Sequence, residues 1–262
     1  MAFCSSAMAV GSPSGGVFIE DLTSFELKAM VASGTTTVLI PIGGTEQNGP
    51  HMALGKHNVR VRFLAGLIAQ RLGNAVVAPV IAYVPEGVIS PPVAHMRFSG
   101  TISIAPSTFE SILESAASSF RQHGFHDVVF LGDHGGYQKN EVNAANRINK
   151  RLGADAKFRA YGLTAFYEAA QTPFTQVLKN KGFSDAEIGT HAGLSDTSLM
   201  LAIDKSLVRS EMLVTGSRTG SADGVTGDPR RSSVELGKIG VQLIVDKSVQ
   251  AIQQAIRQGT NR

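Results

Sequence analysis

Apolar, β-branched segments alternate with amphipathic helical patterns along most of this chain. Residues 36–40 (TTVLI) form such a segment, whose character is typical of a strand buried on both faces of a parallel sheet. The same pattern predicts strands over residues 75–80, 127–131 and 158–163. Apolar residues at helical spacing predict helices over residues 58–72, 107–123, 140–152, 196–203 and 234–257.

This alternation of strands and helices predicts the fold class. We expect an α/β fold, a three-layer sandwich with a mostly parallel central sheet and helices on both faces. Local signals mark some helix ends: Asn58 can cap the helix over 58–72, and Gly73 follows it. Before the last helix, residues 216–233 are rich in Gly, Ser and Asp, which predicts a loop.

The composition indicates one domain. A chain of 262 residues with 43% hydrophobic content can bury one large core, and no long linker interrupts its middle. We therefore expect a single domain over residues 17–262. Residues 1–16 are small, rich in Ser and Gly and without a basic start, as in a flexible arm rather than a signal peptide. A chain that has lost its leader would look the same, so the cytoplasm is only slightly favoured over export.

Charge and hydropathy exclude two classes of partner. Lys and Arg number 24 against 21 for Asp and Glu, without a basic block, so we expect no nucleic acid. Every apolar stretch falls short of the roughly 20 residues of a membrane helix, so we expect no membrane partner. Cys4 is the only cysteine, which rules out an internal disulfide.

Candidate chemistry begins where the first predicted strand ends. Glu46, His51 and His57 follow that strand within a dozen residues of one another. Carboxylates and imidazoles are common metal ligands, and open parallel sheets bind ligands beyond the carboxyl ends of their strands. The spacing therefore predicts a metal or catalytic site at this edge of the sheet.

Two later segments add to the predicted site. Gly132-Asp133-His134-Gly135-Gly136 follows the third predicted strand, and its glycines let the backbone turn away sharply, so we expect His134 in the crevice that holds Glu46. Residues 191–198 (HAGLSDTS) enter a helix. There Asp196 either orients His191 for acid–base chemistry or binds the helix N-terminus. No Gly-x-Ser-x-Gly elbow occurs, which disfavours a serine nucleophile.

Together these motifs resemble the creatininase (creatinine amidohydrolase) family. Its members carry Glu-Gln-His-Gly-x-His-Leu-Pro-x-x-x-Asp after a strand, an Asn-Gly-His turn, and a His-[Ala/Gly]-Gly-x-x-Glu-Thr-Ser segment. Residues 46–57 (EQNGPHMALGKH), 132–136 and 191–198 match them in the same order. Residues 95–103 (HMRFSGTIS) and 224–229 (GVTGDP) match further family segments, and the resemblance runs from about residue 17 to the C-terminus.

The resemblance implies a metal site that departs from the family pattern. Creatininase holds two metals, and carried over position by position the first keeps Glu46 and His134 but has His57 in place of its bridging Asp. The second metal's positions become Asn48, His57 and Gly136. An imidazole cannot bridge two ions, Asn is a poor ligand and Gly offers no side chain. We therefore expect one divalent metal, Zn²⁺ before Fe²⁺ or Mn²⁺, held by Glu46, His57 and His134.

The activity implied is hydrolysis of a C–N bond in a small molecule: an amide, a cyclic amide or a formamide. Water activated by the metal would attack the carbonyl, while His191 with Asp196 passes a proton to the leaving nitrogen, and Asp133 or His51 activates or positions the water. The expected substrate contacts are Asn48, His51, His95, Gly135, Gly136 and Tyr137.

Other functions stay open at this stage. The same metal site suits a lactone or ester hydrolase, and a member without metal would serve as a binding or assembly protein. Loops over residues 83–97 and 161–174 are expected to set specificity, and the lack of Trp makes creatinine itself a less favoured substrate. By resemblance we expect a homo-oligomer, commonly a hexamer.

Overall fold

A computed structural model describes residues 16–153, 157–215 and 223–260. The arm predicted over residues 1–16, except its last residue, and the first part of the loop predicted over 216–233 lie outside these residues. The described chain contains a four-stranded sheet in the order β2-β1-β3-β4, in which every pairing is parallel. These strands are β1 Thr37–Ile42, β2 Ala75–Val77, β3 Asp127–Gly132 and β4 Arg159–Gly162, so the four predicted strands are confirmed.

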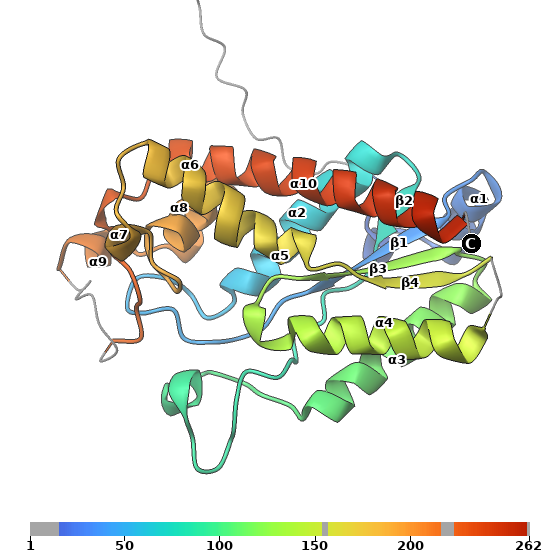
Figure 1. The fold of residues 1–262 in the computed structure, drawn as a ribbon, viewed down its shortest axis with the longest axis horizontal. Coiled ribbons are helices and arrows are strands. Elements are labelled where there is room, and N and C mark those ends of the chain that lie inside the picture. The colour runs from blue at the N-terminus through green and yellow to red at the C-terminus, as the bar shows by residue number, and fades with distance from the viewer. Residues whose placement is uncertain (1–15, 154–156, 216–222, 261–262) are drawn as a thin grey trace, which may run out of the picture.

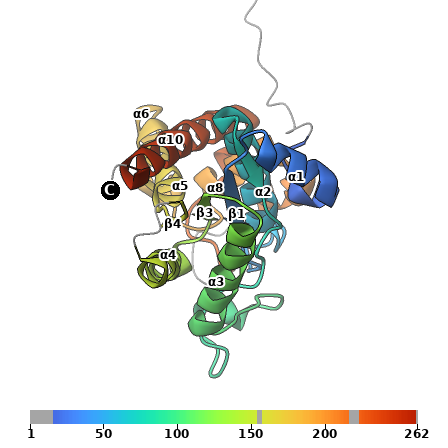
Figure 2. The ribbon, with the colours of Figure 1, turned by 90° about the vertical axis from the view of Figure 1, so that its right-hand side faces the viewer.

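Helices cover both faces of the sheet, which confirms the predicted α/β class. Leu39, Val129 and Leu131 face α2 (Lys56–Leu72), α8 (Leu194–Ile203) and α10 (Val234–Thr260) in one core cluster. The alternate residues of β1 and β3 face α3 (Pro106–Gln122) and α4 (Gln138–Leu152) in a second cluster. Figure 1 shows α10 above the strands with α3 and α4 below them, and Figure 2 shows the same layers end-on.

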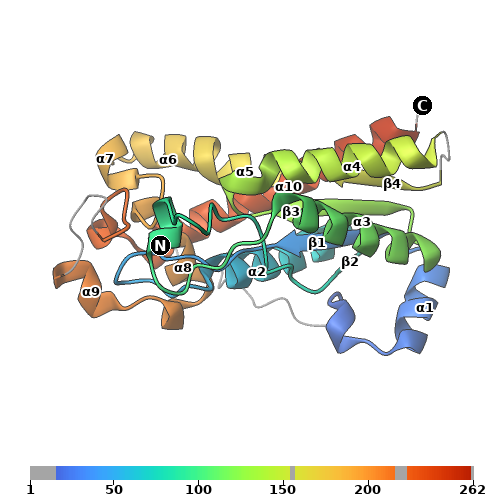
Figure 3. The same cartoon turned by 90° about the horizontal axis from the view of Figure 1, so that it is seen from below.

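These helices confirm the predicted ones to within a few residues, and several short helices were not predicted. They are α1 Ser24–Ala32, α5 Ala165–Ala169, α6 Thr175–Asn180, α7 Asp185–Ile188 and α9 Ser210–Thr215. Seen from below in Figure 3, α3 and α4 lie in front of the strands, and α7 and α9 lie at the far end of the molecule from α1. No helix of the described residues is long and apolar enough to cross a membrane.

The start of α2 differs from the prediction, and the difference positions the site. Asn58 was expected to cap this helix, but α2 begins at Lys56, and Gly55 precedes it without a side-chain cap. Asn58 instead accepts a hydrogen bond from the Gly44 amide at 3.0 Å and so ties the helix to the loop after β1. A Cβ on Gly43 would lie 2.1 Å from Asn58 Oδ1, so this close approach requires glycine. Lys56, His57 and Arg60, at the start of α2, are buried.

The loop predicted over residues 161–174 is also mostly regular structure. Its first residues belong to β4, after which α5 and a π-helical turn, Ala170–Phe174, continue into α6. Phe166 and Phe174 are buried in the core that α10 covers, so apolar packing converts this segment into helix. The remaining expected specificity loop, residues 83–97, contains one short helical turn, Ala94–Arg97.

Glu141→Gln is expected to flatten the fall of stability with rising pH. Burial raises the pKa of Glu141 well above its ordinary value, so the folded chain keeps a proton that the unfolded chain loses above about pH 4.3. Wild-type stability therefore falls by up to about 1.4 kcal/mol per pH unit between the two pKa values. Urea unfolding from about pH 5 to pH 8 should show that the free energy of unfolding of the variant rises relative to that of wild type as pH rises. A constant difference would contradict a protonated Glu141.

Candidate metal centre and active site

The predicted site residues converge at the carboxyl ends of β1 and β3. Register pairs Ile42 with Gly132, so the chain leaves both strands side by side. Beyond these ends lies a hollow of about 230 Å³ that α2, the turn after β3 and the segment before α8 surround. Most of the predicted residues line it, namely His57, His95, Asp133, His134, Gly135, His191 and Asp196.

Glu46 is buried at the centre of this arrangement. Its Oε1 lies 2.7 Å from His57 Nε2 and 3.5 Å from His191 Nδ1. Its Oε2 lies 3.7 Å from both His95 Nδ1 and His134 Nε2, and has no hydrogen-bond partner. Burial opposes ionisation of this carboxyl, but the hydrogen bond and charge of His57 outweigh it and hold the pKa well below its usual range. Glu46 is therefore an anion with one oxygen that no protein group satisfies.

His57 lies between two carboxylates rather than facing the hollow with a free nitrogen. Its Nε2 contacts Glu46, and its Nδ1 lies 2.5 Å from Asp133 Oδ2. Burial and the neighbouring Lys56 oppose protonation, but Asp133 and Glu46 outweigh them and raise the pKa of His57. In this arrangement His57 orients both acids, which differs from the ligand role that the sequence predicts.

Two buried cations that were not predicted balance the acids. Arg60 Nε lies 2.8 Å from Asp133 Oδ2, and its Nη1 lies 2.6 Å from Asp196 Oδ1. Lys56 Nζ lies 2.9 Å from Asp196 Oδ2 and 3.7 Å from Glu46 Oε1. Their i, i+4 spacing on α2 places both on one face, and this spacing beside His57 was the signal available in the sequence.

Asp196 binds the backbone that leads into α8 and two cations. Its Oδ2 accepts a hydrogen bond from the Ala192 amide, just before α8, at 2.9 Å. Burial raises the pKa of Asp196, but Lys56 and Arg60 outweigh it and hold the pKa well below its usual value. Its hydrogen bonds described in the structure go to these cations and to that amide, and none of them joins it to His191.

His191 is neutral and directed at Glu46. Its Nε2 donates to the Gln47 carbonyl at 2.8 Å, which leaves the lone pair on Nδ1 facing Glu46. Burial lowers the pKa of His191 to about 3. The His95 ring lies beside it, with 4.4 Å between ring centroids. At neutral pH the ring is therefore unprotonated, and its Nδ1 lone pair is available inside the hollow.

Glu86 is a buried acid beside the site that the sequence pattern did not reveal. It is buried, neither of its carboxyl oxygens has a hydrogen-bond partner, and its Oε2 lies 3.5 Å from His134 Nδ1. Burial, followed by the charge of Glu46, raises the pKa of Glu86 to about 8, and burial lowers that of His134 to about 4. Glu86 is a single acid in the loop after β2, and no motif of the sequence includes it.

Among the described residues, two groups of side chains have ligand atoms close enough together that they could hold a metal ion. One is Glu46 with His95 and His191, and the other is Glu46 with Glu86 and His134. In the second group, three buried carboxyl oxygens have no hydrogen-bond partner, namely Glu46 Oε2 and both oxygens of Glu86. A divalent cation fits such an environment. Neither group includes His57.

Several predicted substrate contacts have supporting positions. Asn48 Nδ2 donates to the Glu46 and Ala53 carbonyls at 2.9 and 3.1 Å, and His51 Nε2 lies 3.1 Å from Thr197 Oγ1. The Tyr137 hydroxyl donates to the Gly43 carbonyl at 2.6 Å and accepts from the amides of the turn that carries His134. Gly136 donates its amide to His134 Nδ1 at 3.2 Å. Of the predicted contacts, His95 and Gly135 line the hollow itself.

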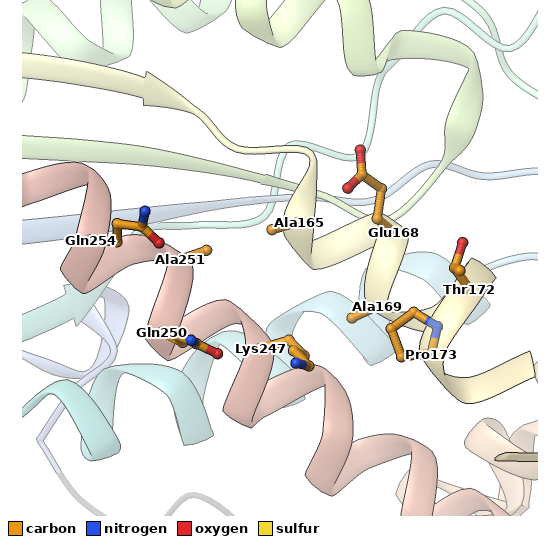
Figure 4. Close-up of a pocket in the computed structure, with 9 residues that line it drawn as sticks. All are labelled: Ala165, Glu168, Ala169, Thr172, Pro173, Lys247, Gln250, Ala251 and Gln254. Carbon is orange, nitrogen blue, oxygen red and sulfur yellow. The ribbon is translucent and has the colours of Figure 1, made fainter. Parts of the chain in front are cut away.

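A larger hollow lies elsewhere on the molecule. Its volume is about 460 Å³. Figure 4 shows its lining residues on α5, the π-helical turn and α10. Its lining has one acid, Glu168, and one lysine, Lys247, among Ala, Thr, Pro and Gln side chains. Neither of the two groups of residues with metal-binding geometry lies there.

The chain is similar to known proteins over most of its length. A family model described as "Creatininase: Creatinine amidohydrolase" matches residues 20–252. The "Mycofactocin precursor peptide peptidase" of Mycolicibacterium smegmatis is 28% identical over 250 residues, covering 87% of this chain and 86% of that protein. The "Creatinine amidohydrolase" of Pseudomonas putida is 26% identical over 265 residues, covering 94% and 98%.

Solved structures share the fold. A structure of creatinine amidohydrolase (creatininase) superposes with a TM-score of 0.77 and 25% identity, covering 93% of this chain and 99% of that one. Two others have the same TM-score of 0.77 at 24% identity and cover 99% of those chains and 92% or 93% of this one. Their descriptions name manganese for one and a zinc pair for the other.

Proposed function

The chain belongs to the creatininase family of metal-dependent amidohydrolases, and we propose that it hydrolyses an amide, cyclic amide or formamide C–N bond in a small molecule. The observation that carries this proposal is Glu46, a buried anion with an unsatisfied oxygen, surrounded by histidines beside a polar hollow. The hollow of about 230 Å³ suits a small ligand, and its lining of acids, histidines and cations favours a polar one.

Glu46 and His134 are the residues that we propose to hold the metal, because the sequence pattern and the metal-binding geometry both include them. A divalent ion at such a site lowers the pKa of water from about 15.7 to about 7 and polarises a carbonyl. The ligand set predicted from the sequence adds His57, whose nitrogens contact Glu46 and Asp133 in this structure. Zn²⁺ or Mn²⁺ fits these donors.

His191 is the residue that we propose to move the proton. Its Nδ1 is free to accept a proton from water near Glu46, and the same atom can then donate to the leaving nitrogen. Asp133 and Asp196 fix the cations Lys56 and Arg60 around this histidine.

The reaction class agrees with the names of two relatives. One is a creatinine amidohydrolase and the other a precursor peptide peptidase, and both names denote cleavage of a C–N bond. We propose that class for this chain, acting on a small molecule. We also propose a homo-oligomer, as expected from the family, which light scattering would test.

Removing the metal or His191 is expected to abolish most of the hydrolysis. The purified protein should hydrolyse members of a panel of small amides, cyclic amides and formamides, lose the activity to a chelator, and regain it with Zn²⁺ or Mn²⁺. His191→Gln should lower kcat by about a hundredfold to ten-thousandfold, as expected for loss of a proton-transfer group. His126→Gln, which replaces an exposed histidine, is the matched control, and its kcat should change little.

The outcomes separate the alternatives. Hydrolysis of lactones or esters in place of the amides would refute the C–N assignment but keep the hydrolase. Activity that is indifferent to the chelator, or a protein without metal and without activity, would contradict the metal-dependent mechanism.

A further inference from the structure

We propose that Glu86 is the third protein ligand of the metal, completing a centre of two carboxylates and one imidazole with Glu46 and His134. This inference rests on the proposed function, and it replaces His57 in the ligand set that the sequence predicts. It assigns a role to a residue in the loop between β2 and α3 that no sequence motif includes.

The first argument is the unsatisfied state of the Glu86 carboxyl group. The side chain is buried, and neither Oε1 nor Oε2 has a hydrogen-bond partner. Glu46 Oε2 is in the same state. Burying polar oxygens without partners is unfavourable, whereas a shared cation satisfies such oxygens directly. The three atoms therefore indicate one missing positive group between the two acids.

The second argument is the position of His134 between these acids. Its Nε2 lies 3.7 Å from Glu46 Oε2, and its Nδ1 lies 3.5 Å from Glu86 Oε2. One ligand atom from each of the three residues falls within 4.8 Å of the others. Two ligands of one Zn²⁺ at about 2.0–2.2 Å from the ion are at most about 4.4 Å apart, so small side-chain movements close the set.

The backbone around Glu86 is built to hold it there. A Cβ on Gly44, which has a φ of +145°, would lie 2.3 Å from Glu86 Oε1. Ser103 Oγ accepts hydrogen bonds from the Glu86 and Gly87 amides at 3.1 and 3.2 Å and donates to the Gly87 carbonyl at 2.8 Å. Glycine thus makes room for the carboxyl group, and Ser103 fixes the loop that delivers it.

The competing ligands are already engaged. Binding through His57 would break its hydrogen bond to Glu46 or to Asp133, and both are buried and charge-assisted. In the other group, binding through His95 Nδ1 would break its contact with the Gln47 side-chain nitrogen, which lies 2.8 Å away. Glu86 has no hydrogen bond of this kind to lose.

The donor set also predicts which metals are favoured. Two carboxylates and one imidazole form a harder, more oxygen-rich site than one carboxylate and two imidazoles. Mn²⁺ should therefore compete with Zn²⁺ better here than at a site with two histidines.

Glu86→Gln is the direct test, read as metal bound rather than as activity. Equilibrium dialysis of the full chain against buffered Zn²⁺ or Mn²⁺ should show affinity weakened by about a hundredfold or more, at or beyond the upper end of the loss for residues that only support a ligand. Glu141→Gln is the matched control. Glu141 is also a buried acid whose carboxyl oxygens have no hydrogen-bond partner, and it belongs to neither metal-binding group. Its affinity should stay within a few-fold of wild type.

A second measurement counts the imidazoles. X-ray absorption of the Zn²⁺-loaded wild type should show one imidazole, against two for ligation with His57 or through His95 and His191. Two imidazoles, or unchanged affinity in a Glu86→Gln chain that unfolds like wild type, would overturn the Glu86 assignment and leave the proposed function standing. A wild type that binds no metal at saturating Zn²⁺ and Mn²⁺ would overturn both.

Discussion

Glu46→Gln is expected to lose the metal and to lower kcat/KM by about a thousandfold, the equivalent of several kcal/mol of transition-state stabilisation. Glu46 belongs to both groups of described residues that have metal-binding geometry. Its loss should therefore remove the metal whichever group holds it. Glutamine keeps the volume of the side chain and one carbonyl oxygen, so the change removes charge with little change in packing.

Elemental analysis and kcat/KM on the best amide substrate measure this result together. Both should fall in parallel for Glu46→Gln, while Glu110→Gln, at a buried acid paired with Arg147 away from the hollow, should keep its metal. A Glu46→Gln chain with a full complement of metal and normal kcat/KM would place the metal at residues other than these two groups.

The strands were predictable because their residues are buried on both faces. β1 has six residues, all buried, and its alternate side chains enter two separate core clusters. Such a segment has no polar face, so apolar composition alone identifies it. The helix over residues 165–174 lacks this signal, because its structure depends on packing of Phe166 and Phe174 under α10.

The edge of the sheet that carries the site was equally readable from the sequence. Glu46 and His134 follow β1 and β3, and parallel strands place their carboxyl ends side by side. Proximity in space therefore follows from proximity to strand ends. Glu86 belongs to an irregular segment, whose path depends on tertiary contacts such as those of Ser103. No local pattern could place its carboxyl group.

The contacts of His57 could not be predicted by comparing the sequence with the family pattern position by position. The family pattern places this residue at a ligand position, but ligation requires a free lone pair directed at the ion. In this structure both ring nitrogens have partners: Glu46 contacts Nε2, and Asp133, which is 76 positions away in the sequence, contacts Nδ1. The start of α2 also depends on a tertiary contact, because Asn58, the expected cap, instead binds the loop after β1.

Arg60→Met is expected to destabilise the fold by about 3–5 kcal/mol, the usual result of breaking a buried ion pair by removing one partner. Arg60 is 4% exposed and bridges Asp133 and Asp196. Without it the buried Asp133 and the partly buried Asp196 lose their principal cation, and Lys56 reaches just Asp196. Methionine fills a similar volume, so the loss reports on charge more than on packing. Urea unfolding of the metal-free chains at neutral pH measures it.

The pH dependence of this loss distinguishes charge from packing. Arg60 helps to hold the pKa of Asp196 well below its ordinary value, against the effect of burial. In Arg60→Met the folded-state pKa of this acid rises, so its uncompensated charge is relieved as pH falls towards about 4. The destabilisation should therefore shrink in acid. Arg71→Met on the same helix removes an exposed pair with Asp246 and should cost at most about 1 kcal/mol. Equal, pH-independent losses in both variants would show that Arg60 acts through packing alone.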